Sequence, residues 1–358
     1  MGGGVVTGAP TAPGTSAAPG APFAPGAPTA PCAPRGEEER RELDREYSPS
    51  SLVDDLTDHL DRYAADSARA RAELTVHRDI PCGPLPEQSL DYFPAPDADA
   101  PLLVFVHGGY WQELSKSEAA FAARDFVAAG ISFAALGYGL APAYSMRRLT
   151  AAAVESLRRI CTGRAGLPGA PRTVHLAGHS AGAHLVASAL LDTAGWRQAG
   201  TEPSAAVASA TLVSGVYDLE LLRHTYVNDA LGMDGAEARE CSPMRLLPEA
   251  SGAPTPAAGV PALPRLIVAR GENETGEFAR QQQEFVRRAR LGRAEVTDLV
   301  VRGRHHFDLP FDLGNPATAL GAEVLRGIRS TRPVGVGSGR AGGQSGYGGR
   351  RAAGTLES

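Results

Sequence analysis

The sequence predicts an α/β domain built on a mostly parallel, doubly wound sheet with helices on both faces. Three observations support this fold class. Strand-like and helix-like segments alternate from residue 102 to residue 329, which is the pattern of repeated βα units. Residues 102–106 form an uninterrupted apolar run, as expected for a strand buried on both faces. The segments before this run are typical of an antiparallel hairpin.

Low-complexity segments flank the predicted domain. Residues 1–34 consist almost entirely of Gly, Ala, Pro, Ser and Thr, and residues 331–358 are rich in Gly, Arg and Ser. Such segments bury too little apolar surface to offset the entropy cost of ordering, so both are predicted to be disordered tails. Residues 35–330 are then expected to form one domain, since single α/β domains often reach this size.

The expected elements follow in order along this domain. A first helix begins at Ser50 or Ser51, either of which could cap it, and ends near Arg71. A Gly- and Pro-containing link then joins two strands into a hairpin, and strands and helices alternate. The strands are expected at residues 74–80, 89–93, 102–106, 131–136, 173–177, 210–216, 263–269 and 296–301. The further helices are expected at residues 117–129, 146–161, 180–191, 277–290 and 317–329, and a surface loop at 250–262.

The composition argues against several kinds of partner. The net charge is −5 and the arginines of residues 340–351 lie in a predicted tail, so no nucleic-acid surface is expected. The chain contains no long apolar segment suited to a membrane and no secretory signal pattern. Cys32, Cys82, Cys161 and Cys241 are scattered without metal-ligand spacing. A disulfide framework is therefore not expected, and the chain is predicted to be cytoplasmic.

A Gly-x-Ser-x-Gly motif at residues 178–182 makes Ser180 a candidate nucleophile. In this turn a serine hydroxyl is held between a strand and a helix, and the tight backbone needs small residues at Gly178 and Gly182. The predicted strand before the motif and the predicted helix after it supply that context, which a chance match in a glycine-rich chain would lack. His179 is interpreted as structural because a neighbour of the serine points elsewhere. The motif predicts an α/β-hydrolase fold.

The sequence His-Gly-Gly-Tyr-Trp at residues 107–111 directly follows the buried strand. In this fold the loop after that strand supplies backbone N–H groups to the oxyanion hole, and HGG-type sequences do so in esterases. Glycines let the backbone approach the substrate closely. The expected donors are the N–H groups of Gly109 or Tyr110 and, from the elbow, that of Ala181. An ordinary strand-ending turn is the alternative, but two independent motifs here agree on a hydrolase.

The order along the chain in this fold is nucleophile, acid, histidine. His305 or His306 follows the last predicted strand, and either can serve as the base. The loop after the preceding strand, residues 270–277, contains no Asp, so an acid there must be a Glu. A metal site on the two histidines is the weaker interpretation, and neither metal nor cofactor is expected. The candidate acids are Glu272, Glu274 and Glu277, with Asp218 on an earlier strand as an alternative that is more simply a loop-capping residue.

Beyond these motifs the chain resembles the arylformamidases, or kynurenine formamidases, of the α/β-hydrolase superfamily. The HGGYW form is more specific than HGG alone, because generic esterases usually carry a third glycine. The matching segments span nearly the whole predicted domain: Glu46–Ser50, His107–Gln112, Leu136–Pro142, Gly178–Leu185, Ser214–Leu219, Glu277–Gln281 and His306–Asp308.

The resemblance implies hydrolysis of N-formyl-L-kynurenine to L-kynurenine and formate, a step of tryptophan degradation. It also implies Glu274 as the acid, since the family's acid lies three residues before a Glu-Phe pair, here residues 277–278. The family's histidine precedes Phe-Asp, which implies His306 as the base. The chain departs from the family in having Glu where many relatives have Asp, and Thr-Gly at residues 275–276 where Ser-Pro is usual.

The aryl amine that leaves in such a reaction needs flat apolar walls. Candidates for these walls are Trp111, Tyr138 and Phe307, together with Tyr110. The predicted partner is a small aromatic formamide or ester, and a homodimer is compatible with this interpretation. A carboxylesterase acting on small acyl or aryl esters would use the same residues. A non-catalytic binding module is the third hypothesis, but it would require a missing triad member, and none is missing.

Overall fold

The computed structural model describes Met1, residues 36–249 and residues 261–331. The predicted tails, 1–34 and 331–358, and the predicted loop at 250–262 lie almost entirely outside the described residues. From Gly36 onward the described residues belong to one compact unit.

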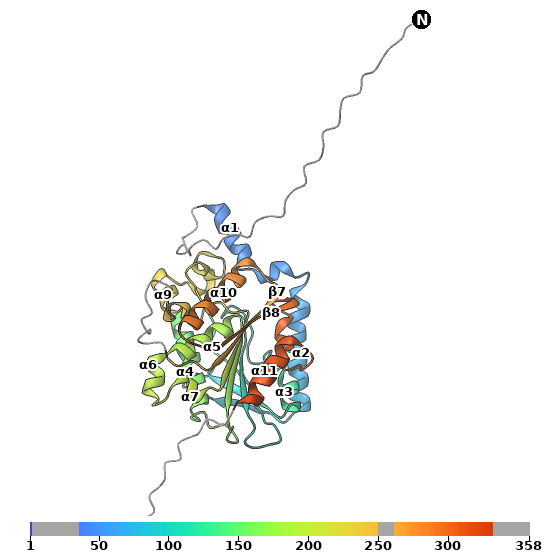
Figure 1. The fold of residues 1–358 in the computed structure, drawn as a ribbon, viewed down its shortest axis with the longest axis vertical. Coiled ribbons are helices and arrows are strands. Elements are labelled where there is room, and N and C mark those ends of the chain that lie inside the picture. Colours follow the sequence, from blue (N-terminus) through green and yellow to red (C-terminus); the bar gives the residue numbers. More distant parts are fainter. Residues whose placement is uncertain (2–35, 250–260, 332–358) are drawn as a thin grey trace, which may run out of the picture. The chain divides into compact units, whose positions relative to one another are not determined.

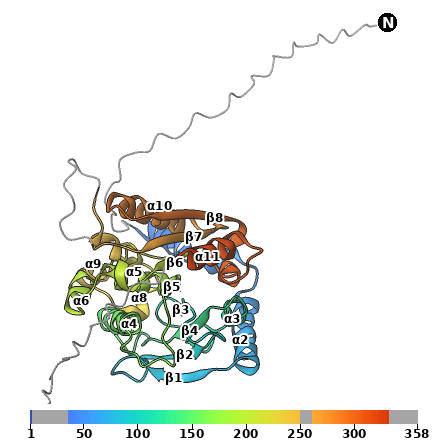
Figure 2. The same ribbon diagram turned by 60° about the horizontal axis from the view of Figure 1, so that its bottom comes forward.

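The strands of the described residues form one eight-stranded sheet in the order β1-β2-β4-β3-β5-β6-β7-β8. β1 pairs antiparallel with β2 and β2 with β4, and every other neighbouring pair is parallel. Figure 2 shows this sequence of strands from β1 to β8. The predicted mostly parallel sheet is thus confirmed. The strands are β1 (His77–Pro81), β2 (Ser89–Phe93), β3 (Leu102–Val106), β4 (Ser132–Leu136), β5 (Val174–His179), β6 (Ser209–Val213), β7 (Arg265–Asn273) and β8 (Val296–His305).

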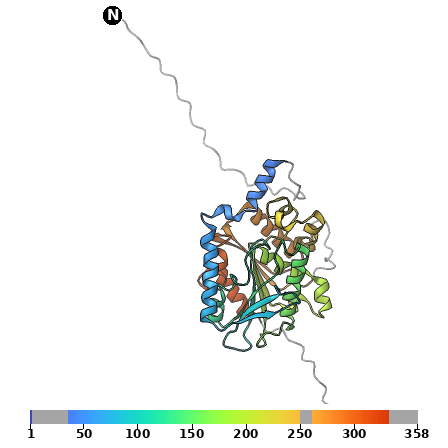
Figure 3. The ribbon, with the colours of Figure 1, turned by 180° about the vertical axis from the view of Figure 1, so that it is seen from behind.

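Helices cover both faces of this sheet. In Figure 1, α4, α5 and α10 lie on one side of the strands and α2, α3 and α11 on the other, and Figure 3 shows the same two layers from behind. The α-helices are α1 (Glu37–Glu46), α2 (Leu56–Glu73), α3 (Ala123–Ala128), α4 (Met146–Cys161), α5 (Ala181–Leu191), α6 (Thr193–Gln198), α7 (Pro203–Ala206), α8 (Asn228–Leu231), α9 (Gly235–Glu240), α10 (Gly276–Leu291) and α11 (Ala319–Ser330). The 3₁₀ turns are η1 (Pro49–Leu52), η2 (Leu222–His224), η3 (Pro243–Leu246) and η4 (Leu309–Asp312).

The central strand β3 separates two apolar cores. Leu102, Val104 and Val106 pack in the core that contains residues of α4, α5 and α10. Leu103 and Phe105 point to the other side, into the core that contains residues of α3 and α11. Because both faces of β3 are buried, every position needs an apolar residue, which explains the uninterrupted run in the sequence.

Several elements differ from the sequence prediction. The first predicted helix, α2, begins at Leu56 with Asp55 as its N-cap, whereas Ser50 and Ser51 lie in the 3₁₀ turn before it. The short helices α6 to α9 were not predicted.

The helix expected at residues 117–129 contains only α3, because contacts with α2 fix the chain before it in a non-helical path. The Arg71 guanidinium donates to the carbonyl oxygens of Lys116 and Ser117 at 2.6 and 2.7 Å. The helix α1 was not predicted. It contains no fully buried residue, so its sequence lacks the apolar stripe that reveals most helices.

The sheet topology brings the predicted site residues to one edge. β3, β5, β7 and β8 run parallel, so their carboxyl ends lie at the same edge of the sheet. β7 and β8 extend to Asn273 and His305, further than predicted, so Glu274 and His306 each directly follow a strand. Ser180 follows β5 in the same way. This arrangement matches the general rule that ligands bind beyond the carboxyl ends of parallel strands.

Candidate active site

A cavity of about 270 Å³ lies at this carboxyl edge. Its lining includes Ser180, His306, Gly109, Tyr110 and Phe307. These residues come from the elbow after β5, the loop after β8 and the loop after β3. The structure therefore brings together predicted site residues that are as much as 198 positions apart in the sequence, as Gly109 and Phe307 are.

The turn after β5 has the geometry that a nucleophile elbow requires. Ser180 has φ 53° and ψ −115°, a region that residues with a side chain seldom adopt. A Cβ atom on Gly178 would lie 2.4 Å from the backbone of Gly182, and one on Gly182 would lie 2.0 Å from the Val106 carbonyl oxygen. Both positions therefore need glycine, because any side chain would collide with backbone.

A carboxylate and an imidazole form a pair beside this turn. His306 Nδ1 lies 3.1 Å from Glu274 Oε2, and the Glu274 side chain is fully buried. Glu274 Oε1 also accepts from Ser214 Oγ at 2.7 Å and from the Gly271 N–H at 2.6 Å. With Nδ1 turned toward the carboxylate, Nε2 is the ring nitrogen left for another partner. Within the described residues Ser180 Oγ has no hydrogen-bond partner, and catalytic hydrogen bonds often tighten only when substrate is bound.

The other candidate acids are engaged elsewhere. Glu272 accepts from a backbone N–H of the neighbouring strand at 2.9 Å. Asp218 accepts from a backbone N–H two residues along its own loop at 3.0 Å, as a loop-capping residue does. Glu277 lies in the first turn of α10 and accepts from a buried tyrosine hydroxyl at 2.7 Å. Of the four candidate acids, Glu274 is the one in contact with His306.

The remaining two histidines near the site have distinct surroundings. His305 Nδ1 accepts from the Phe307 N–H at 3.2 Å, and its ring lies edge-on to His59 at 4.8 Å, outside the cavity lining. His179 lines the cavity and donates from Nε2 to the His306 carbonyl oxygen at 3.0 Å. Burial and the neighbouring His306 hold the pKa of His179 well below its usual value, so the ring is neutral. His179 thus braces the backbone of His306, a contact that the sequence did not reveal.

Three backbone N–H groups near the elbow lack an acceptor within the described residues, two in the loop after β3 and one at the start of α5. None of the described residues accepts a hydrogen bond from the N–H of Gly109, Tyr110 or Ala181. Gly109 has φ 97°, which favours glycine, and a Cβ atom on Gly108 would lie only 3.2 Å from Ser180 Cβ. Ala181 is the first residue of α5, where the helix dipole adds partial positive charge. Such free donors beside a serine can stabilise an oxyanion.

Two of the residues predicted to form substrate walls, Trp111 and Tyr138, lie outside the cavity. Trp111 is completely buried, with its ring edge-on to His184 at 5.0 Å, and Tyr138 stacks on His107 at 4.2 Å. Neither lines the cavity, because both rings pack into the apolar core on the α4 and α5 side of the sheet. Neither ring therefore forms part of the cavity wall, and contact with substrate stays a prediction for both. Phe307, the third predicted wall, does line the cavity.

Sequence reasoning missed several other residues that line the cavity. Pro49, Leu56 and Leu60 reach it from η1 and α2, and Tyr226 reaches it from the segment between β6 and β7. Part of the signal was present, because Pro49 lies in one of the family-like segments. The role of Ser214 was also missed. Its hydrogen bond to Glu274 forms because β6 and β7 are neighbours in the sheet, and the sequence does not state the strand order.

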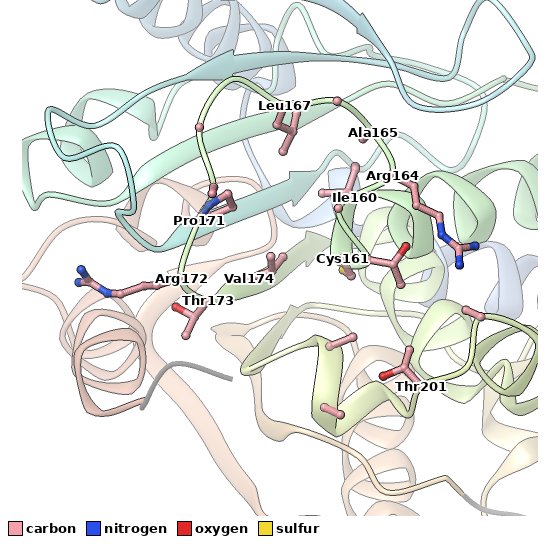
Figure 4. A pocket seen from close by; sticks show the side chains of 18 residues that line it. Ile160, Cys161, Arg164, Ala165, Leu167, Pro171, Arg172, Thr173, Val174 and Thr201 are labelled. Atoms are coloured by element: carbon pink, nitrogen blue, oxygen red, sulfur yellow. The ribbon is translucent and has the colours of Figure 1, made fainter. Parts of the chain in front are cut away.

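A larger cavity of about 590 Å³ lies elsewhere (Figure 4). It is lined by the end of α4 and the loop that leads into β5, including Ile160, Arg164 and Val174. This places it at the amino end of β5, whereas Ser180 follows the carboxyl end. None of the predicted site residues lines it, so volume alone would select the wrong site.

The described residues contain neither a candidate membrane-spanning helix nor a candidate metal-binding cluster. None of their helices combines the length and apolar character needed to cross a membrane. Among the same residues, no group of three or more His, Cys, Asp or Glu side chains is arranged to hold a metal ion.

Comparison with known proteins bears on this geometry. Residues 103–307 match the family model described as the alpha/beta hydrolase fold. The kynurenine formamidase of Danio rerio is 32% identical over 276 residues, which cover 75% of this chain and 89% of that protein. The kynurenine formamidase of Salmo salar is 32% identical over 252 residues, covering 68% and 81%. The chain belongs to the kynurenine formamidase family of α/β-hydrolases.

Membership of this family identifies the chain as a hydrolase. A crystal structure of a putative thioesterase from Silicibacter has the same fold, with a TM-score of 0.65 and 24% identity over 79% of this chain and 98% of that one.

Proposed function

We propose that the chain hydrolyses the formamide of N-formyl-L-kynurenine, with Ser180 as nucleophile, His306 as general base and Glu274 as the acid that orients it. The observation that carries this proposal is the contact of 3.1 Å between His306 Nδ1 and Glu274 Oε2 beside a cavity that Ser180 also lines. Relatives with 32% identity carry the name kynurenine formamidase, which supports the choice of substrate.

In the first half of the reaction, Ser180 Oγ attacks the formyl carbon and its proton passes to His306 Nε2. The carbonyl oxygen becomes an oxyanion, and we expect it to bind the N–H groups of Gly109, Tyr110 and Ala181, which have no acceptor among the described residues. Glu274 holds the Nδ1 proton and stabilises the imidazolium that forms. Collapse of the intermediate breaks the C–N bond, and His306 gives its proton to the departing aryl amine.

In the second half, a water molecule replaces the amine. His306 takes a proton from this water as it attacks the formyl ester of Ser180. The ester bond breaks, Ser180 Oγ recovers the proton from His306, and formate leaves. L-Kynurenine and formate are then the two products, and no cofactor enters the balance.

The cavity suits a small acyl group joined to an aromatic amine. Tyr110 and Phe307 are proposed as aromatic walls, since both line the cavity. Its volume of about 270 Å³ restricts substrates to small molecules. A homodimer and a cytoplasmic location stay predictions from the sequence.

Hydrolysis of small acyl or aryl esters is the second candidate function. It is favoured by a further relative, the isoprenylcysteine alpha-carbonyl methylesterase of Arabidopsis thaliana, which is 27% identical over 65% of this chain and 57% of that protein. The same nucleophile, base and oxyanion donors would act on an ester, so the two functions differ only in the leaving group.

Steady-state kinetics on N-formyl-L-kynurenine and on p-nitrophenyl acetate tests the proposal. We expect kcat/KM for the formamide to exceed that for the acetate, and Ser180→Ala to reduce both by several orders of magnitude while the circular dichroism spectrum is retained. A fluorophosphonate reagent should label the wild type at Ser180 alone. Efficient acetate hydrolysis with no measurable deformylation would favour the esterase instead.

A further inference from the structure

The end of α1 contacts the loops that surround the cavity. We call residues Asp44–Tyr47 the clamp segment. Asp44 Oδ1 accepts from the Tyr226 N–H at 2.8 Å, and Tyr226 lines the cavity. Four further hydrogen bonds join Glu46 and Tyr47 to the loop after β3 and to the start of α10.

On one side the clamp segment holds the loop that carries the proposed oxyanion donors. The Tyr110 hydroxyl donates to the Tyr47 carbonyl oxygen at 2.6 Å. Burial holds the pKa of Tyr110 well above its usual value, so this hydroxyl keeps its proton. Tyr110 has φ 47° and Trp111 has φ 59°, and such left-handed residues persist only where the surroundings impose them. The bond to Tyr47 is one such constraint.

On the other side the clamp segment holds the residue that follows the proposed acid. Thr275 is the N-cap of α10, yet its side chain makes no capping bond within that helix. Its hydroxyl donates instead to the Glu46 carbonyl oxygen at 2.6 Å. The Glu46 carboxylate accepts from the Glu277 N–H at 2.7 Å and so caps α10 from another part of the chain. Glu274 is the direct neighbour of Thr275, so this contact fixes its backbone.

The Tyr47 side chain anchors the clamp segment itself. It is completely buried, and its hydroxyl donates to Glu277 Oε1 at 2.7 Å. Because the anchor is buried and hydrogen-bonded to α10, the carbonyl oxygens of Glu46 and Tyr47 sit at fixed positions between the two loops.

We propose that the clamp segment couples the oxyanion loop to the acid loop and thereby positions the catalytic groups. Tyr110 and Thr275, through their hydroxyls, and Tyr47, through its buried anchor, act as positioning residues. The inference rests on the proposed function, because that proposal identifies which groups are catalytic. Displacements of about 1 Å in such groups can cost about 100-fold in rate, so contacts remote from the substrate can control kcat.

Matched substitutions at position 275 test the acid side. Thr275→Val keeps the shape of the side chain and removes the hydroxyl, whereas Thr275→Ser keeps the hydroxyl. We expect Thr275→Val to lower kcat about 10-fold with KM within about twofold, and Thr275→Ser to retain most of the activity. A merely structural contact would lower the melting temperature and leave kcat unchanged.

Tyr110→Phe tests the oxyanion side, with Tyr144→Phe as a control. The Tyr144 hydroxyl donates a hydrogen bond to the Glu87 carboxylate at 2.7 Å, and Tyr144→Phe removes it. Tyr144 does not line the cavity. We expect kcat to fall about 10- to 100-fold for Tyr110→Phe and to change less than twofold for the control. The Tyr110→Phe, Thr275→Val double variant should lose less than the product of the single losses, because both changes release the same segment.

The readouts separate this inference from the proposed function. Each variant is measured with N-formyl-L-kynurenine, with p-nitrophenyl acetate and by the rate of Ser180 labelling with a fluorophosphonate. If the wild type fails to deformylate, the proposed substrate is wrong, and acetate turnover and labelling still report on the clamp segment. If both variants keep kcat and the labelling rate within about threefold, or if their losses multiply without coupling, positioning by the clamp segment is refuted.

Discussion

Replacing Glu274 by glutamine should give the sharpest test of the acid. The two carboxylate oxygens have different partners: Oε1 accepts from Ser214 Oγ and the Gly271 N–H, and Oε2 faces His306 Nδ1. A glutamine oxygen must remain with the two donors, so its NH₂ group would face the imidazole. Nδ1 would then have to accept, and the ring proton would move to Nε2. That nitrogen is the one that must take the proton of Ser180.

The magnitude follows from this tautomer change. The corresponding Asp→Asn substitution in a serine protease leaves the geometry intact and lowers kcat by about 10⁴-fold. Such a factor corresponds to about 5 kcal/mol of transition-state stabilisation. We expect Glu274→Gln to approach this loss near neutral pH, while the stability of the protein changes little because all three groups around the side chain keep a hydrogen-bond partner. The loss should still be smaller than that of Ser180→Ala, since nucleophile and oxyanion donors remain.

The assay is kcat/KM on N-formyl-L-kynurenine or p-nitrophenyl acetate at pH 7.5. Glu272→Gln is the matched control, because Glu272 lies two residues before Glu274 at the end of β7, is exposed and undergoes the same Glu-to-Gln change. We expect the control to stay within about twofold, as surface substitutions usually do. If Glu274→Gln retained more than a tenth of the activity while Asp218→Asn proved as damaging as loss of the histidine, the acid would lie after β6 and the reasoning would be refuted.

Two further predictions concern histidines. His306→Ala should nearly abolish turnover whereas His305→Ala, whose ring lies outside the cavity lining, should stay within about threefold in kcat; equal losses would mean that the wrong ring was chosen. Burial lowers the pKa of His184 to about 4 from an ordinary 6.5, so the unfolded chain binds more protons between these values and stability is lost as pH falls below 6.5. His184→Gln should reduce this slope by about 1.1 kcal/mol per pH unit in urea denaturation between pH 5 and 6, and an unchanged slope would contradict the assignment.

Local signals determined most of the fold. The run at residues 102–106 predicted β3 to the residue, because a strand buried on both faces must be apolar throughout. The helix α4 was likewise predicted at Met146–Cys161. The failures were elements whose conformation is set by partners far away in the sequence or whose residues form no detectable pattern. Arg71 holds residues 116–117 out of a helix, and α1 offers no apolar stripe to detect.

The candidate site divides in the same way. The sequence by itself determined Ser180 and the HGGYW loop, because each function requires a fixed local order of small and polar residues. From the residues alone the acid and the base stayed ambiguous, and only the family resemblance pointed to Glu274 and His306. The tertiary structure then brings these two side chains into contact. The sequence could not state this, because the direction of a side chain in a loop depends on the residues that pack around it.

What only the tertiary structure decided is which residues surround that site. Trp111 and Tyr138 belong to the core instead of the cavity, and the clamp segment reaches both loops from the start of the domain. No local pattern encodes such contacts. They arise when the parallel strands align their carboxyl ends and the chain buries its remaining apolar rings. Side chains far apart in the sequence then meet, as do those of Tyr47 and Glu277, which are 230 residues apart.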